Sequence, residues 1–151
     1  MRLLSPTAYG PSPVIVQRGE FQVPDSALNY RGGSEAVSYL ASSVKNYSSG
    51  LNILVHLTSS YSFPVQLGSI TVTWSGGGTY SQVVVNGISE TFASAVSSGT
   101  VKAIGATMVL PGNSSNNSLE IVFSADMTGR LITVVLSWLN RSRTDSVAYT
   151  P

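Results

Sequence analysis

The sequence predicts an all-β protein, a single-domain antiparallel β-sandwich resembling a jelly roll. From Leu51 onward, short runs rich in Val, Ile, Leu and Thr alternate with turn-forming residues at a spacing of about 8–12 residues, which is typical of sandwiches. The chain of 151 residues is long enough for one domain with its own core, and we see no internal repeat. We expect an extended arm and loop over residues 1–33, the sandwich over residues 34–140 and a C-terminal tail over residues 141–151.

The segment Leu119–Leu139 is the best candidate for the centre of the fold. Two strand-like runs flank the loop SADMTG, in which Gly129 can adopt the positive φ that a hairpin loop of this length usually needs. The second run is apolar at most positions of both faces, as in a strand buried between two layers. We therefore predict a hairpin whose second strand is central.

The other strands follow from alternation of apolar and polar residues. Asn86-Gly87 is the strongest short hairpin signal in the chain, and Pro111–Ser118 reads as a polar loop. Strands are expected at Leu51–Leu57, Ser69–Trp74, Tyr80–Val85, Ile88–Phe92, Thr100–Ile104 and Thr107–Leu110.

The segment Ser34–Tyr47 is compatible with two structures. Val37, Leu40, Ala41 and Val44 have the spacing of a helix face, and Ser34 could cap such a helix. Alternation of Val37, Tyr39 and Ala41 would serve a strand equally well. One short helix is therefore possible here, and the pattern leaves both alternatives open.

The N-terminal region is rich in proline, with Pro6, Pro11, Pro13 and Pro24. Prolines at this density exclude a helix and a central strand, so we expect an extended arm with at most edge strands at Val14–Val16 and Phe21–Val23, followed by a loop over Asp25–Gly33. Such an arm is ordered most easily against another subunit. The alternative is an arm folded back on its own domain.

The composition excludes several classes of protein. A net charge of +1 gives no electrostatic reason to bind nucleic acid or an acidic membrane surface. The absence of cysteine excludes disulfides and thiolate metal sites. Charged residues make up 10% of the chain, against about 25% in an ordinary soluble domain, which favours a protein that works packed against neighbours or outside a cell. We find neither a signal peptide nor an apolar run of about 20 residues that could cross a membrane.

Groups that could carry out catalysis are sparse. His56 is the only histidine, and the seven carboxylates are scattered singly, so no metal-binding spacing can be assembled. A Ser-His-Asp arrangement using His56 and Asp126 lacks the nucleophile elbow of a hydrolase. Nothing in the sequence requires Glu90 and Glu120 to face one groove as a glycosidase pair would. We therefore expect no enzyme, no cofactor and no metal.

The residues that we expect at an interface with other proteins are those that we expect to be exposed. Tyrosines flanked by Ser, Gly and Asn provide rigid contact area at interfaces, although ordinary loop tyrosines are the alternative. The candidates are six arm residues and one tail residue, namely Leu3, Leu4, Tyr9, Val14, Val16, Phe21 and Tyr149.

The arm at Met1–Pro24, the sandwich at about Leu51–Leu139, and the lack of cysteine and of an active site resemble the small capsid cement (decoration) proteins of tailed bacteriophages and other small virion jelly rolls. The resemblance is architectural, covers the chain loosely and includes no diagnostic motif. It implies a structural virion protein, made in the host cytoplasm, that forms a dimer or trimer. Its partners would be the major capsid protein or other virion subunits, and the arm would lie across neighbouring capsid subunits.

Two other functions remain open at this point. A carbohydrate-binding or adhesion module would need an exposed aromatic platform, for which Trp74, Trp138 or Tyr80 are candidates, although both tryptophans fall on apolar strand faces that favour the core. A subunit of a filament or tail fibre would instead donate the arm as a strand to the next subunit.

Overall fold

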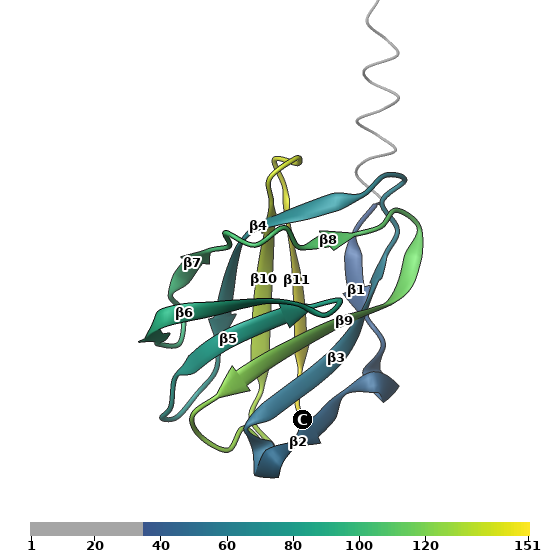
Figure 1. The fold of residues 1–151 in the computed structure, drawn as a ribbon. Coiled ribbons are helices and arrows are strands. Elements are labelled where there is room, and N and C mark those ends of the chain that lie inside the picture. Colours follow the sequence, from purple (N-terminus) through teal and green to yellow (C-terminus); the bar gives the residue numbers. More distant parts are fainter. Residues whose placement is uncertain (1–34) are drawn as a thin grey trace, which may run out of the picture. The chain divides into compact units, whose positions relative to one another are not determined.

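A computed structural model describes residues 35–151, which fold as two antiparallel β-sheets packed face to face (Figure 1). The six-stranded sheet has the order β1-β3-β9-β5-β6, with β2 also pairing with β3. The five-stranded sheet has the order β11-β10-β4-β7, with β8 also pairing with β4. The predicted all-β sandwich is confirmed. The expected arm, with its strands at Val14–Val16 and Phe21–Val23, lies outside the described residues.

The elements of the six-stranded sheet are β1 (Val37–Tyr39), β2 (Lys45–Tyr47), β3 (Asn52–Ser59), β5 (Tyr80–Val85), β6 (Ile88–Val96) and β9 (Ser114–Phe123). Those of the other sheet are β4 (Val65–Thr73), β7 (Val101–Ala103), β8 (Val109–Leu110), β10 (Ile132–Trp138) and β11 (Thr144–Tyr149). Two 3-10 turns, η1 (Ala41–Ser43) and η2 (Ser48–Gly50), flank β2. None of the helical elements in residues 35–151 is long and apolar enough to cross a membrane.

Consecutive pairing joins β2 to β3, β5 to β6 and β10 to β11, whereas β3, β4, β6, β8 and β9 are each followed by a strand of the opposite sheet. The β5–β6 turn is the predicted one: Asn86 and Gly87 have φ angles of 50° and 83°, as a two-residue type I′ hairpin requires.

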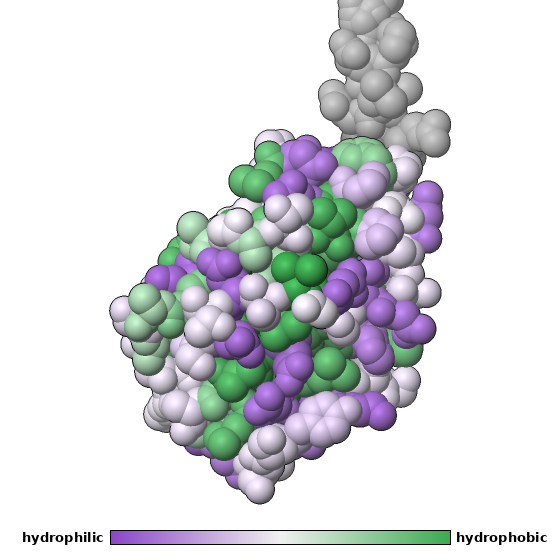
Figure 2. Space-filling model, viewed as in Figure 1, coloured by the Kyte–Doolittle hydropathy of each residue, from purple (hydrophilic) through white to green (hydrophobic). Residues whose placement is uncertain are grey.

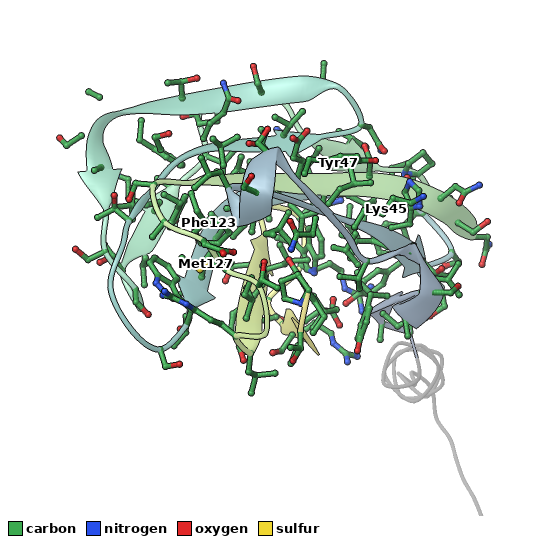
Figure 3. All side chains as sticks on the ribbon, turned by 90° about the horizontal axis from the view of Figure 1, so that it is seen from below. Lys45, Tyr47, Phe123 and Met127 are labelled. Atoms are coloured by element: carbon green, nitrogen blue, oxygen red, sulfur yellow. The ribbon has the colours of Figure 1, made fainter. Side chains whose placement is uncertain are left out.

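The predicted hairpin within Leu119–Leu139 is wrong. Its first strand belongs to β9, which pairs with β3 and β5, whereas its second is β10, which pairs with β4 and β11. The loop between them crosses from one sheet to the other and packs against η2. There the Met127 N–H donates to the Gly50 carbonyl, and a side chain on Gly50 would collide with the Asp126 carboxylate. Figure 3 shows this end of the molecule, with Lys45 and Tyr47 of β2 and with Phe123 and Met127.

The structure decides one open alternative and corrects two other expectations. Ser34–Tyr47 holds two short strands, β1 and β2, separated by η1, so the strand alternative holds in its described part. The polar loop expected over Pro111–Ser118 ends early, because β9 starts at Ser114. The C-terminal tail expected over residues 141–151 contains β11, a full strand of the five-stranded sheet.

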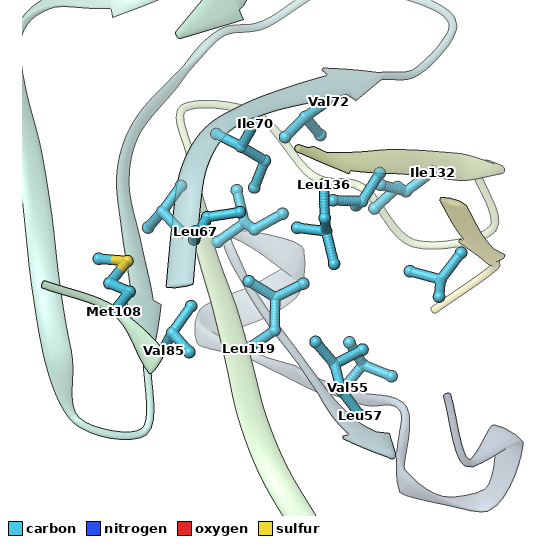
Figure 4. Packing of buried hydrophobic residues seen from close by; sticks show 14 of the residues in the cluster. Val55, Leu57, Leu67, Ile70, Val72, Val85, Met108, Leu119, Ile132 and Leu136 are labelled. Carbon is cyan, nitrogen blue, oxygen red and sulfur yellow. The ribbon is translucent and has the colours of Figure 1, made fainter. Parts of the chain in front are cut away.

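The core lies between the sheets and follows the alternation of the sequence (Figure 4). Val55, Leu57 and Leu119 project from one sheet, and Ile70, Val72, Ile132 and Leu136 project from the other. Each such buried side chain contributes about 1.5–3 kcal/mol. β10 is central in its sheet, as predicted, but only its core-facing residues are fully buried and Thr133, Val135 and Ser137 are half-buried. On the face that Figure 2 shows, apolar and hydrophilic residues are interspersed.

Candidate interaction surface

The N-terminal segment joins the sandwich at a firmly bonded point. The Ala36 N–H donates to Ser60 Oγ over 2.9 Å, and the Ser60 N–H and hydroxyl both donate to the Ala36 carbonyl, over 3.0 and 3.1 Å. The Glu35 carboxylate lies 3.8 Å from a guanidinium nitrogen of Arg141, in the β10–β11 turn. The chain therefore enters the domain at a fixed position beside the β3–β4 and β10–β11 loops.

A buried carboxylate lies next to this entry point. Asp145 of β11 is 5% exposed, and its Oδ2 accepts hydrogen bonds from the Tyr61 hydroxyl over 2.6 Å and from Trp138 Nε1 over 2.8 Å. A buried charge is tolerated only when donors of this kind compensate for its lost hydration. The three side chains connect β11, β10 and the β3–β4 loop.

Tyr61 is the less exposed partner in this group and acts only as a donor. Burial, followed by the hydrogen bond to Asp145 and the charge of that carboxylate, raises the pKa of Tyr61 from 10.0 to about 12, although Arg143 and Arg141 act in the opposite direction. The phenol is therefore protonated at physiological pH. The arrangement fixes the geometry of this end of the sandwich and is poorly suited to proton transfer near neutral pH.

The surface above this group combines a cation with exposed apolar side chains. The Arg141 guanidinium carbon lies 4.8 Å from the ring centre of Tyr61 and 5.2 Å from that of Phe63, within cation–π distance. Phe63 is 38% exposed and Leu139 is 66% exposed. Asn140 fixes the turn, since its Oδ1 accepts from the Gln66 N–H and its Nδ2 donates to the Pro64 carbonyl. We call Glu35, Phe63, Leu139 and Arg141 the junction surface.

The sequence-predicted interaction residues fall in two groups. Leu3, Leu4, Tyr9, Val14, Val16 and Phe21 lie outside the described residues. Tyr149 was expected to be exposed, but it is 3% exposed and its ring centre lies 5.7 Å from that of Tyr39. The reason is that residues 144–149 form β11, in which Asp145, Val147 and Tyr149 share the core-facing side.

The aromatic platform considered for sugar binding is not exposed. Trp74 and Trp138 are each 5% exposed and Tyr80 is 0% exposed, so all three belong to the core. For the two tryptophans, this is the position that their apolar strand faces predicted. Glu90 and Glu120 take separate hydrogen bonds: Glu90 accepts from the backbone N–H groups of Gly105 and Ala106, and Glu120 accepts from Asn52 Nδ2. No group of three potential metal-ligating side chains occurs within residues 35–151.

The role of Asp145 is not predicted from the sequence pattern, although one signal for it is present. Asp145 has the same parity in β11 as Val147 and Tyr149, so a strand at this position would carry the carboxylate to the core-facing side. Recognising that strand would have predicted a buried, hydrogen-bonded acid. Its donors come from Tyr61 and Trp138, and Tyr61 is far away in the chain.

Comparison with protein-family models and with curated proteins finds no match for this chain.

Proposed function

We propose that this chain is a structural virion protein of the capsid cement type, which binds the major capsid shell and stabilises it. The observation that carries the proposal is the junction. The first described residues, Glu35 and Ala36, are held on the sandwich by the bonds of Ala36 with Ser60 and by the ion pair of Glu35 with Arg141. A strap that carries load between subunits needs an attachment of this kind.

The junction surface supports the proposal on chemical grounds. Arg141 over the rings of Tyr61 and Phe63 combines arginine with aromatic groups, both of which are enriched at protein interfaces. The low charge of the whole chain, 10% charged residues, is consistent with a surface that meets protein neighbours. Many copies bound at symmetry-related positions would add weak contacts through avidity.

The test is a reconstitution with particles. Virus particles from the source that encodes this chain are purified by density gradient, stripped of the protein with mild denaturant, and heated with and without the purified full-length chain. We expect stripped particles to break at a lower temperature and the added protein to restore the original temperature. If the protein is absent from purified particles, or restores nothing, the cement function is wrong.

The Arg141→Ser variant sharpens this test, because it removes the guanidinium from the junction surface. We expect it to restore particle stability less well than the natural chain. Arg130→Ser is the matched control, since Arg130 donates to the carbonyls of Ser75 and Gly77 in the β4–β5 loop, outside the junction surface.

A further inference from the structure

Two of the four sheet edges are interrupted. Along one edge of β3, the short strands β1 and β2 are separated by η1 (Ala41–Ser43), so neither offers more than three residues. Along one edge of β4, β7 and the two-residue β8 are separated by residues 104–108. Short edge strands are a known protection against unwanted pairing, because they offer few hydrogen bonds to an incoming strand.

The third edge, β6, is long but irregular. Gln82 of β5 pairs with Thr91 whereas Tyr80 pairs with Val96, which leaves residues 92–95 opposite Ser81 alone. Glu90 also turns inward, and its carboxylate accepts hydrogen bonds of 3.2 and 2.9 Å from the backbone of Gly105 and Ala106. The irregular register discourages the addition of another strand.

The fourth edge, β11, lacks such protection. Its six residues pair with β10 without interruption, from Ile132 opposite Tyr149 to Ser137 opposite Thr144. Among residues 35–151, β10 is the only strand that pairs with it. Its outward side chains Thr144, Ser146 and Ala148 are small, neutral and exposed, and its one charged residue, Asp145, is buried. An exposed, regular and uncharged edge is a template for strand addition.

The occupant of this edge follows from where the remaining chain is attached. Glu35, which 34 residues precede in the sequence, lies near β11, because it pairs with Arg141 of the β10–β11 turn and Tyr39 of β1 packs against Tyr149. At roughly 3.3 Å per residue the preceding residues can extend about 110 Å. A domain of this size is only about 35 Å across. The segment is therefore long enough to reach a neighbouring molecule.

We propose that the free edge of β11 binds the N-terminal segment of a second copy of this chain, as an added β-strand. The apolar stretches Val14–Val16 and Phe21–Val23 would supply that strand, through main-chain hydrogen bonds to β11. The attachment point and the acceptor edge lie on the same side of the sandwich, so two copies can exchange segments reciprocally and close a twofold dimer. This inference rests on the proposed assembly function and specifies the first contact of that assembly.

The test combines mass and hydrogen exchange on the full-length protein. Light scattering gives the mass in solution, and amide hydrogen exchange reports residues 144–149, with β10 as the internal reference. We expect a dimer in which the β11 amides that point away from β10 exchange at least tenfold more slowly than open-edge amides. The triple variant Val14→Asp/Val16→Asp/Phe21→Asp should be a monomer with fast exchange at β11 and unchanged exchange at β10.

The matched control is Ser12→Asp/Gln17→Asp/Gln22→Asp, which adds the same charge to the same segment at polar positions and should remain a dimer with slow exchange. Three results would overturn the proposal. A monomer with slow β11 exchange means that the segment lies on its own domain. A dimer with fast β11 exchange means that another surface makes the contact. A dimer that persists with slow exchange in the triple variant means that two β11 edges pair directly.

This experiment contains no virus particle, so its failure leaves the cement function open. Conversely, if the chain forms the segment-exchanged dimer but does not restore the stability of stripped particles, the proposed β11 contact is correct and the proposed capsid function is wrong.

Discussion

The sandwich has two sides at which edge strands of the two sheets face each other, and their charged side chains make different contacts. Where β6 faces β7, charged side chains connect the two sheets: Glu90 of β6 binds the backbone after β7, and the Lys102 ammonium of β7 lies 5.1 Å from the ring centre of Phe92 on β6. Where β1 faces β11, the charge of Asp145 is drawn into the core, and the edge of β11 is left neutral. Both carboxylates point inward but have different partners: Glu90 accepts from backbone N–H groups that follow a strand of the opposite sheet, whereas Asp145 accepts from the side chains of Tyr61 and Trp138.

The largest loss of stability is expected for Asp145→Ala, on the side where β1 faces β11. Without the carboxylate, the Tyr61 hydroxyl and Trp138 Nε1 lose their shared acceptor in a buried place. Leaving two buried donors unpaired should lower the free energy of unfolding by about 3 kcal/mol, as measured by urea denaturation. Asp126→Ala, at an exposed carboxylate, is the control and should cost much less. A loss below about 1 kcal/mol for Asp145→Ala would show that the buried group is not a stabilising centre.

Alkaline pH should lower the free energy of unfolding through one buried tyrosine on each side. Burial raises the pKa values of Tyr61 and Tyr80 from 10.0 to about 12, and the Asp145 hydrogen bond adds to the effect for Tyr61. Because the folded-state pKa values lie above the unfolded ones, the unfolded chain loses these protons first. The stabilisation is complete below pH 10 and should disappear progressively between pH 10 and 12. Urea unfolding at a series of pH values measures it, and constant stability across that range would contradict the prediction.

Removing one hydroxyl from each side should give different results. Tyr61→Phe deletes a hydrogen bond to a charged acceptor and should cost about 2 kcal/mol. The Tyr80 hydroxyl is buried and has no hydrogen-bond partner within residues 35–151, so Tyr80→Phe should change stability by less than about 0.5 kcal/mol or raise it slightly. Equal losses in urea denaturation would remove this difference between the sides.

Glu90→Ala tests the hydrogen bonds between the Glu90 side chain of β6 and the backbone that follows β7. The variant leaves the N–H groups of Gly105 and Ala106 without their acceptor and should cost about 1 kcal/mol. Hydrogen exchange should accelerate at those two amides while residues of β10 remain unchanged. Glu120→Ala, which removes only a bond from Asn52, is the control and should leave these amides unaffected.

The smallest expected effect is that of Lys102→Met. The substitution keeps an unbranched side chain over the β6 edge and removes the ammonium above Phe92, which should lower the free energy of unfolding by about 0.5 kcal/mol. Lys45→Met, on the exposed strand β2, is the control. Thermal unfolding of both variants at low and high salt gives the measurement, and a larger loss in the control would contradict the prediction.

Local patterns predicted the strands well and their partners poorly. Alternation placed Tyr80–Val85 and the Asn86-Gly87 turn correctly, because a two-residue hairpin is a local structure. The run after SADMTG carries an equally good strand pattern, yet its partners are β4 and β11 and not β9, because its pairing with β4 depends on residues far away in the chain. Asn117 was assigned to a loop because it is polar, but it is buried and donates to the Leu57 carbonyl and to Ser114 Oγ.

The candidate surface was harder to predict for the same reason. The junction surface and the buried group next to it bring together residues from three separate segments of the chain, namely Glu35, Tyr61, Arg141 and Asp145. No spacing in the sequence marks them as neighbours. Only the parity of Asp145 with Val147 and Tyr149 could have been used.

The order of the strands has a consequence for biosynthesis. β3 pairs with β9 and β4 pairs with β10, so neither sheet can close until most of the chain has left the ribosome, and such long-range pairing is slow. β11 follows β10 in the chain, and the two can pair only after both have emerged. Its edge therefore forms when residues 1–34 have long been outside the exit tunnel. On a polysome that carries several nascent copies, donor segments would already be present at high local concentration when each new acceptor edge forms.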